Sequence, residues 1–457
     1  MATEPRTVTV NDIIDNQPIS TFQIVTILLC SLVLLLDGFD TQAMGFLVPP
    51  IAEELEIPLS AFGPVLSAGL FGLMIGAMSA GPVADRWGRK WAIIISSIVF
   101  GFFSLLTPQA DSIRALVILR FLTGLGLGGA MPNVVALASE YAPKRLQPIL
   151  VTAIFAGMGG GAVLASLVGG ALIPIWGWRS VFYVGGVLPI ALALVLIKAL
   201  PESVRFLTAK GRDPEQVSAI VRRIAPSMAN VPLAAPPRAT ARAEGMPVAQ
   251  LFSEGRTLGT LLLWVPFFMN LLILYFILSW LPSLLRQAGM PVSAGITAVM
   301  VFSIGGIIGA FVQGPIMKAA GVFPAMIAEF AVSLALVLMA SVIFANFQLM
   351  MIVTFILGVS VQGAQAGLNV LSAMYYPTVI RSTGVGWALG VGRVGSIVGP
   401  MIGGVMLSLQ WTPQQIFAAG AVPAVCAAAA VIASSALQGR ASPFRPDTQT
   451  EPAGPAH

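Results

Sequence analysis

FQIVTILLCSLVLLLDGFDTQAMGFLVPPI, from Phe22 to Ile51, is almost entirely apolar, yet it carries two aspartates, Asp37 and Asp40. A run of about 20 apolar residues is long enough to cross a bilayer as a helix. A charged side chain at the bilayer centre costs about 2.5–3.5 kcal/mol on insertion scales, so such residues usually face a water-filled path or a binding cavity. The stretch therefore predicts the first membrane-spanning helix and contains the first candidates for a functional site.

The composition of the whole chain indicates a polytopic membrane protein. Of its 457 residues, 57% are hydrophobic and only 9% are charged, whereas soluble domains carry about 25% charged residues. The net charge of +5 could suit a nucleic acid, but the basic residues fall in short loops between apolar runs, so we expect no such partner. The lone histidine is His457, and Cys30 and Cys426 lie in apolar runs, which indicates no catalytic histidine, disulfide framework or metal site.

Apolar runs of spanning length recur along the chain and predict an all-α fold with about twelve transmembrane helices. They lie near 22–48, 61–83, 91–107, 113–136, 149–173, 180–200, 257–284, 293–316, 321–343, 347–373, 383–408 and 415–437. We predict an N-terminal tail (1–21), a six-helix bundle (22–200), a linker (201–256) with some helix near 213–224, a second bundle (257–437) and a C-terminal tail (438–457).

Loop charge predicts the orientation of the spans. Most of the 24 Lys and Arg residues fall in the two tails, the linker and alternate loops, and the positive-inside rule places these segments in the cytoplasm. The first apolar run is too long and too acidic for a cleaved signal peptide. We therefore expect a multi-pass protein of the plasma (inner) membrane, with both termini cytoplasmic.

The two predicted bundles repeat each other. A shift of 234 residues superposes Phe121, Gly124 and Tyr141 on Phe355, Gly358 and Tyr375. Two parallel six-helix repeats around a site at the membrane midplane are a transporter architecture. Transport would then follow from rocking of one half against the other.

The loop between the second and third spans contains a further motif. It reads Gly81-Pro82-Val83-Ala84-Asp85-Arg86-Trp87-Gly88-Arg89-Lys90. It resembles the signature loop of the major facilitator superfamily. Its glycines allow close approach of backbones, and Asp85 could bridge basic groups and a neighbouring helix end, latching the halves in one state. Its basic residues are equally explained as topology charges.

Further motifs narrow the resemblance. They are Asp37-Gly38-Phe39-Asp40, Pro49-Pro50, Pro201-Glu202-Ser203, and Tyr376-Pro377 with Arg381, Gly384, Gly386, Arg393 and Gly395. Together they resemble the aromatic acid:proton symporter family, whose members import benzoate- or 4-hydroxybenzoate-type anions with protons. The resemblance implies the major facilitator fold, a role in aromatic acid catabolism and no cofactor besides the coupling proton. We also expect a functional monomer.

Asp37 and Asp40 are the candidate proton-coupling residues. At positions i and i+3 they share one helix face, where low dielectric and mutual repulsion favour protonation of at least one. The alternative is that one aspartate caps a helix break at Gly38 or pairs with a basic residue.

Arg393 is the candidate ligand for the substrate carboxylate. It lies about ten residues into the eleventh span, near mid-depth at ~1.5 Å per residue, and a guanidinium can bind a carboxylate through two parallel hydrogen bonds. The alternative is a permanent salt bridge to Asp37, Asp40 or Glu329. Glu329, an isolated acid in the ninth span, is a secondary candidate that a structural role would also explain.

Five more residues complete the candidate site. Arg120 and Glu140 bracket the fourth span. The resemblance implies roles in transport, which we assign as substrate binding for Arg120 and gating for Glu140; interfacial or interhelical ion pairs are the alternative. Arg381 opens the loop before the eleventh span and could serve topology or gating. Phe39 and Trp387 could form aromatic walls for a planar ring.

The sequence argues against an enzyme. Gly124-Leu-Gly126-Leu-Gly128-Gly129 has G-x-G-x-x-G spacing, but no βαβ unit surrounds it, so close helix packing is the better interpretation. The resemblance, with which the charged residues of the spans agree, implies a proton-coupled symporter that imports an aromatic carboxylate by alternating access. The alternatives are a symporter for a non-aromatic organic anion, such as a dicarboxylate or sugar acid, and a transporter-like chemoreceptor.

Overall fold

The computed structural model describes residues 10–209, 214–226, 248–344, 346–377 and 380–440. This part of the chain is helical without strands, and twelve helical segments are long and apolar enough to span a membrane. The predicted all-α class and the number of spans are confirmed. The outer parts of both predicted tails and the middle of the predicted linker lie outside the described residues.

The spanning helices form two sets of six. The first comprises α2 (Thr21–Glu54), α3 (Gly63–Trp87), α4 (Arg89–Leu106), α5 (Ile113–Tyr141), α6 (Gln147–Trp176) and α7 (Arg179–Ala199). The second comprises α10 (Thr257–Gln287), α11 (Val292–Ala320), α12 (Val322–Ile343), α13 (Phe347–Tyr375), α14 (Arg381–Ser408) and α15 (Pro413–Ala419) continued by α16 (Ala421–Arg440). Short helices are α1 (Val10–Asn16), α8 (Val204–Ala209), α9 (Pro214–Ile224) and the 3-10 turns Leu59–Phe62, Thr107–Gln109 and Ala249–Phe252.

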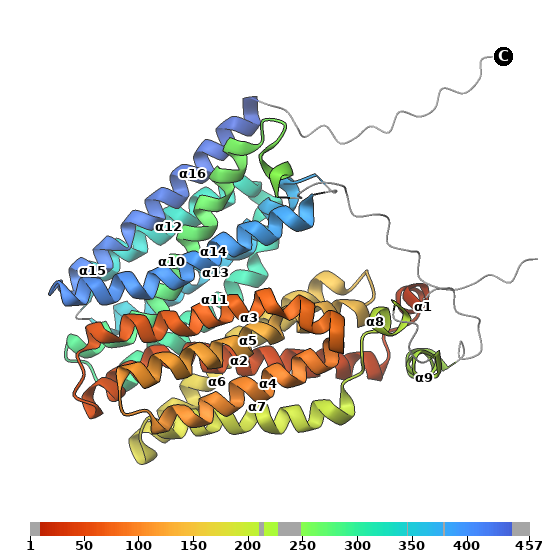
Figure 1. Cartoon of the computed structure of the whole chain (residues 1–457). Coiled ribbons are helices and arrows are strands. Elements are labelled where there is room, and N and C mark those ends of the chain that lie inside the picture. The colour runs from red at the N-terminus through yellow and green to blue at the C-terminus, as the bar shows by residue number, and fades with distance from the viewer. Residues whose placement is uncertain (1–9, 210–213, 227–247, 345, 378–379, 441–457) are drawn as a thin grey trace, which may run out of the picture.

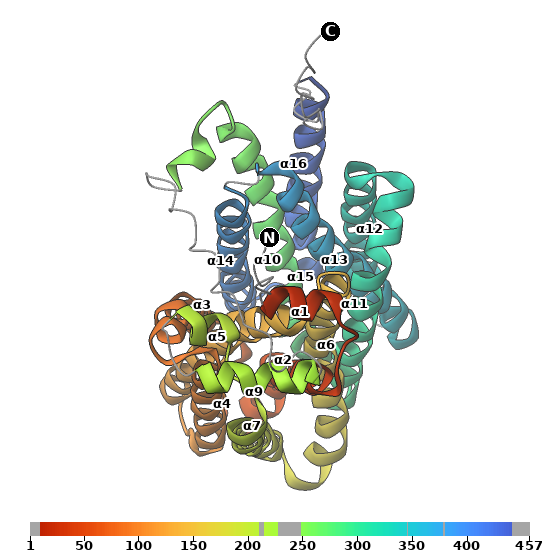
Figure 2. The ribbon, with the colours of Figure 1, turned by 90° about the vertical axis from the view of Figure 1, so that its right-hand side faces the viewer.

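The two sets form separate halves that meet at one end of the molecule. Figure 1 shows the N-terminal half below and the C-terminal half above, diverging toward α1, α8 and α9. We call this the α1 end, and the opposite end, where α2 finishes at Glu53 and Glu54, the Glu53 end. Figure 2 looks onto the α1 end and places α1 and α9 against the N-terminal half.

Apolar packing and one ion pair attach α1 to that half. Ile13 of α1 and Val221 of α9 are buried in the same apolar cluster as residues of the spanning helices. Asp15 pairs with Lys144 at 2.8 Å, and this hydrogen bond raises the pKa of Lys144. Both charges stay outside the spans.

Equivalent glycines hold equivalent helices together in the two halves. A Cβ on Gly72 would come within 2.1 Å of the Phe121 carbonyl oxygen, and one on Gly305 within 2.2 Å of the Phe355 carbonyl oxygen. Such contacts let α3 approach α5, and α11 approach α13, without side chains between them. The structure therefore repeats the pattern seen in the sequence, and the packing role of the glycine-rich segment is confirmed by Gly124, whose Cβ would lie 2.0 Å from the Gly69 carbonyl oxygen.

Gly38, between the two aspartates, serves the same purpose. The helix α2 runs unbroken through it from Thr21 to Glu54, so the alternative of an aspartate capping a break there is wrong. A Cβ on Gly38 would lie 1.9 Å from the carbonyl oxygen of Met158 in α6. The glycine is therefore required for contact between α2 and α6.

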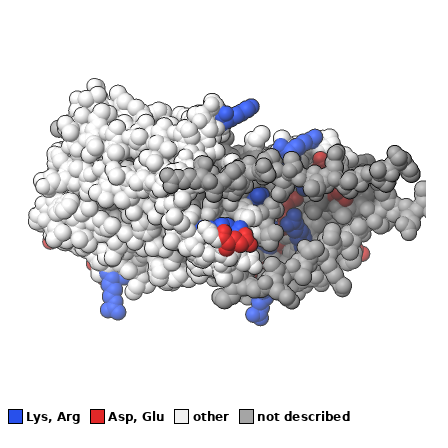
Figure 3. Space-filling view, turned by 90° about the horizontal axis from the view of Figure 1, so that it is seen from above, with Lys and Arg blue, Asp and Glu red and all other residues white. Residues whose placement is uncertain are grey.

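The outer surface suits a lipid environment. Large apolar side chains such as Ile175, Trp176 and Val342 are exposed, which in a soluble monomer would form unusually large apolar patches. Figure 3 shows a broad uncharged face over the C-terminal half, with charged side chains mainly beside it and toward the α1 end. The chain is thus a multi-pass membrane protein.

Candidate functional site

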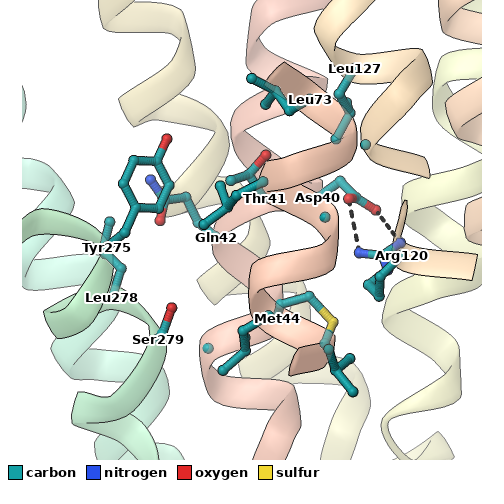
Figure 4. A pocket seen from close by; sticks show the side chains of 16 residues that line it. Asp40, Thr41, Gln42, Met44, Leu73, Arg120, Leu127, Tyr275, Leu278 and Ser279 are labelled. Carbon is teal, nitrogen blue, oxygen red and sulfur yellow. Dashed lines mark hydrogen bonds and ion pairs between the residues drawn. The ribbon is translucent and has the colours of Figure 1, made fainter. Parts of the chain in front are cut away.

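A cavity of about 520 Å³, open solvent included, lies where the two halves face each other. Its walls come from α2, α3 and α5 of the N-terminal half and from α10 of the C-terminal half. The lining residues are Asp40, Thr41, Gln42, Met44, Gly45, Val65, Leu66, Gly69, Leu70, Leu73, Arg120, Gly124, Leu127, Tyr275, Leu278 and Ser279. Figure 4 shows Thr41 and Gln42 on the α2 wall and Tyr275 and Ser279 on the α10 wall.

Asp40 and Arg120 form a buried ion pair within the N-terminal half. The Arg120 Nη1 donates to Asp40 Oδ2 at 3.0 Å and its Nη2 to Asp40 Oδ1 at 3.3 Å, as the dashed lines of Figure 4 mark. Ser104 also donates to Asp40, and Arg120 also donates to Thr123. The two predicted candidates, one for the proton and one for the substrate, therefore neutralise each other here.

Asp37 lies one turn earlier and has a different environment. Its side chain is fully buried, and Oδ1 accepts one hydrogen bond from Thr41 at 3.1 Å. Its Oδ2 has no hydrogen-bond partner in the described part of the chain. A buried carboxylate so weakly satisfied is costly in its charged form and is a natural place for a proton.

Arg393 reaches from the C-terminal half toward the N-terminal half. Its Nη1 donates to the Tyr275 hydroxyl at 3.4 Å, and its Nη2 lies 3.5 Å from the sulfur of Met131 in α5. Among the described residues it makes no ion pair with Asp37, Asp40 or Glu329, so the alternative of a fixed salt bridge does not describe this conformation. Its charge nevertheless acts on Asp37 across the interface.

The other predicted side chains of the site lie away from this centre. Phe39 is buried against α7, with its ring 3.1 Å from where a Cβ on Gly185 would be. Trp387 is 45% exposed and stacks on Trp264 at a centroid distance of 6.0 Å. Neither lines the cavity. Glu329 lies inside the C-terminal half, where Gln313 donates to it at 3.2 Å.

Some of the predicted gating residues form a cluster, and others are exposed at the end of α3, which extends through Trp87 into the predicted loop. Arg89 pairs with Glu140, and Glu140 accepts from the Ser203 hydroxyl at 2.6 Å. Glu202 accepts from the backbone N–H groups of Arg89 and Lys90 at 2.8 and 3.1 Å, which caps the first turn of α4. This cluster fastens α4, α5 and the segment after α7 within one half.

Gly88 adapts the backbone to this cap. It has φ of +95°, and a Cβ there would lie 2.1 Å from Glu202 Oε2. Gly81, Asp85 and Arg86 are exposed on the last turns of α3, and the described residues offer no hydrogen bond or ion pair to Asp85. Arg381 begins α14 at the α1 end and donates to the Tyr376 carbonyl at 3.3 Å. No latch from Asp85 to the other half is formed in this conformation.

The halves are joined at the Glu53 end instead. Arg286 of α10 donates to Glu53 of α2 at 2.7 Å, and Ser67 of α3 donates to the Ile397 carbonyl of α14 at 2.8 Å. A Cβ on Gly45 would lie 1.9 Å from the Leu278 carbonyl oxygen, so the helices α2 and α10 touch through backbone. The cavity is therefore closed toward this end.

Sequence reasoning did not single out Gln42, Ser279 or the ion pair of Glu53 with Arg286. Tyr275 lies among many aromatic residues of the apolar runs, and its sequence neighbours do not distinguish it from the others. Gln42 is a polar residue in an apolar run, two positions after Asp40, and this was an available signal for it. The partner of Glu53 lies more than two hundred residues away, so no local pattern could have indicated it.

Twelve spanning helices in two halves, with a cavity between them that charged and polar side chains help to line, are the architecture of a membrane transporter. The part of the chain described here contains no group of three side chains able to hold a metal ion. Residues 30–340 match the Major Facilitator Superfamily. The chain therefore belongs to this superfamily of transporters and is not an enzyme.

Several transporters are similar in sequence to this protein over nearly the whole chain. The 4-hydroxybenzoate transporter PcaK of Pseudomonas aeruginosa is 40% identical over 92% of this chain and 94% of its own length. The gallate transporter of Pseudomonas putida is 39% identical over 95% and 96%, and the benzoate transport protein of Acinetobacter baylyi 35% over 92% and 91%. The fold is similar to that of the Escherichia coli xylose transporter XylE in a partially occluded inward-open conformation, with TM-score 0.67, 15% identity, and coverage of 93% of this chain and all of that one.

Proposed function

We propose that the protein is a proton-coupled symporter that imports an aromatic carboxylate. The observation that carries the proposal is the arrangement of Arg393 and Asp37, which hydrogen-bond to the cavity-lining residues Tyr275 and Thr41 from opposite halves. On one half is a cation that makes no ion pair with the described residues, and its charge acts on a buried, weakly satisfied carboxylate of the other half. Relatives named as transporters of 4-hydroxybenzoate, gallate and benzoate support the substrate class.

The anion would bind to Arg393. Its guanidinium can offer two parallel N–H groups to a carboxylate, and the neighbouring Tyr275 hydroxyl can hydrogen-bond the substrate. Thr41, Gln42 and Ser279 lie on the cavity wall and can contact a ring hydroxyl. The apolar remainder of the wall, such as Leu66 and Leu278, can pack against the ring.

The coupling proton would bind to Asp37. When Asp37 is charged, it interacts electrostatically with Arg393 and weakens the attraction of Arg393 for the substrate carboxylate. When Asp37 is protonated, the full charge of Arg393 acts on the substrate. Binding of proton and anion are therefore mutually favourable, as linkage requires. Asp40, neutralised by Arg120, holds the fold of the site.

Alternating access would use different contacts between the halves at the two ends of the molecule. The halves are joined by Glu53 and Arg286 at one end and diverge at the α1 end. With the orientation predicted from loop charge, this conformation opens toward the cytoplasm. The opposite conformation would separate Glu53 from Arg286 and bring the exposed Asp85 toward the C-terminal half.

Uptake into liposomes tests the proposal. Purified protein should accumulate labelled 4-hydroxybenzoate or benzoate under an inward proton gradient, and dicarboxylates and sugar acids should compete poorly. A dicarboxylate or sugar acid taken up in preference would identify a different substrate class. Counterflow of labelled substrate should occur, and its absence together with tight binding would identify a receptor.

Two variants test the assigned roles. Arg393→Lys keeps the charge but loses the paired N–H groups, so KM should rise about tenfold or more, since such a charged hydrogen bond is worth about 1.5–3 kcal/mol. Asp37→Asn should abolish accumulation against a gradient while counterflow continues. Arg114→Lys, an exposed change at the start of α5, is the matched control and should leave both activities unchanged.

A further inference from the structure

Glu329 is a carboxylate inside the C-terminal half that has an amide, and no cation, as its side-chain partner among the described residues. Its Oε2 accepts from Gln313 Nε2 of α11 at 3.2 Å. The helices that pack against α12 are α11, α13, α15 and α16. Their charged or titratable residues are Lys318, Tyr375, Cys426 and Arg440, and none of these pairs with Glu329.

The amide partner is itself incompletely satisfied. Gln313 is 2% exposed, and its Oε1 has no hydrogen-bond partner in the described chain. A Cβ on Gly363 of α13 would lie 2.9 Å from Glu329 Oε1 and 3.3 Å from Gln313 Oε1. Two acceptor oxygens thus border the same small space with no donor between them, which is an arrangement that calls for an explanation.

A proton on Glu329 supplies the missing donor. A protonated carboxyl group has one O–H to donate, and a primary amide can donate through N–H while accepting through its oxygen. We propose that Glu329 and Gln313 form such an acid–amide pair and that Glu329 is a second proton-carrying site. This inference rests on the proposed symport, to which it adds a second proton for each anion.

The position of the pair suits proton exchange. Gln313 and Glu329 lie eight residues before and after Gly321 in the turn between α11 and α12, which is about 12 Å from that turn at 1.5 Å per residue. Glu329 is only partly buried, so its carboxyl group is not sealed inside the half in this conformation. The helix α11, which carries Gln313, also packs on α2 and α6 of the other half, so movement of the halves changes the contacts of this helix.

The number of protons decides whether membrane potential drives uptake. Two protons with one monoanion move one net positive charge, and one proton with one monoanion moves none. A charge gains about 2.3 kcal/mol per 100 mV, so about 60 mV, inside negative, gives a tenfold concentration ratio without a pH gradient.

Reconstituted protein with an imposed potassium diffusion potential provides the experiment. The unaltered protein should accumulate labelled 4-hydroxybenzoate about tenfold at about 60 mV. Glu329→Gln, which imitates the neutral acid, should give a ratio near one under potential alone while still accumulating substrate under a pH gradient. Glu215→Gln, an exposed change on α9, is the matched control and should behave as the unaltered protein.

The outcomes separate the two proposals. No accumulation by the unaltered protein under a pH gradient overturns the symport itself. Accumulation under a pH gradient with no response to potential, or a full tenfold response in Glu329→Gln, overturns only the second proton site. If Glu329→Gln does not fold, Glu329→Met is equally unable to carry a proton and replaces it with the same expected result.

Discussion

Breaking the ion pair of Asp40 with Arg120 should destabilise the protein strongly. Both side chains are almost fully inaccessible, at 3% and 4% exposure. Asp40→Asn would leave the guanidinium with Thr123 and the ring of Phe182, 5.2 Å away, as its remaining favourable contacts. Removing one partner of a buried pair costs about 3–5 kcal/mol, because the other charge stays buried without compensation.

The double variant separates loss of the pair from loss of either side chain. Asp40→Asn with Arg120→Gln removes both charges together, so it should cost clearly less than the sum of the two single changes. The pair of Glu53 with Arg286 is the internal comparison, since both its side chains are exposed, at 54% and 39%. The same cycle there should give a coupling energy of about 0–1 kcal/mol.

The measurement is unfolding of purified protein in mixed micelles by titration with SDS, followed by tryptophan fluorescence. All four proteins of each cycle are compared at one pH and one detergent composition. If Asp40→Asn costs no more than Glu53→Gln, Asp40 is neutral in the folded protein. That result would refute the ion-pair reasoning and make Asp40 a proton carrier.

Three further variants test helix contacts and the two ends. Gly38→Ala should lower the melting temperature, because overpacking against α6 costs about 1–3 kcal/mol or more. Gly160→Ala, whose Cβ would have no atom within 4 Å, is the control and should leave the melting temperature unchanged. Equal melting temperatures of the two variants would contradict the contact of Gly38 with α6. Glu53→Lys should place like charges beside Arg286 and favour opening of that end, seen as faster labelling of a cysteine introduced in the cavity; unchanged labelling would exclude the pair as a gate. Gly88→Ala should lower thermal stability through strain at positive φ and collision with the carboxylate cap of α4, and stability equal to that of the unaltered protein would contradict this role.

The fold could be predicted from sequence because its main determinants are local. Apolar run length decides which segments span a bilayer, and the spacing of glycines such as Gly124 and Gly358 discloses the repeat without any knowledge of contacts. The unbroken course of α2 through Gly38 could not be predicted in this way. Whether a glycine ends a helix or packs against another depends on the neighbouring backbone, here that of Met158.

The sequence identifies most charged residues of the site, but it does not show which residue each of them pairs with. Charged residues are rare in membrane-spanning runs and usually have a function. The sequence alone therefore identifies Asp37, Asp40, Arg120 and Arg393 as candidates. Asp40 and Arg120 are 80 positions apart, and periodicity carries no information on which cation each acid meets. Trp387 was expected to line the cavity, but it stacks on Trp264 instead. This contact depends on how α10 packs on α14, which the sequence does not show.

The different partners of the two aspartates lead to different expected roles in the proposed cycle. The Arg120 that neutralises Asp40 belongs to the same half, so rocking of the halves as rigid bodies leaves that pair intact. The cation that acts on Asp37 is Arg393, which belongs to the other half, so the same motion changes the electrostatic environment of Asp37. A coupling site must differ in proton affinity between the two conformations. Of the two acids, only Asp37 has an interaction that the motion alters, and we therefore assign the coupling proton to it.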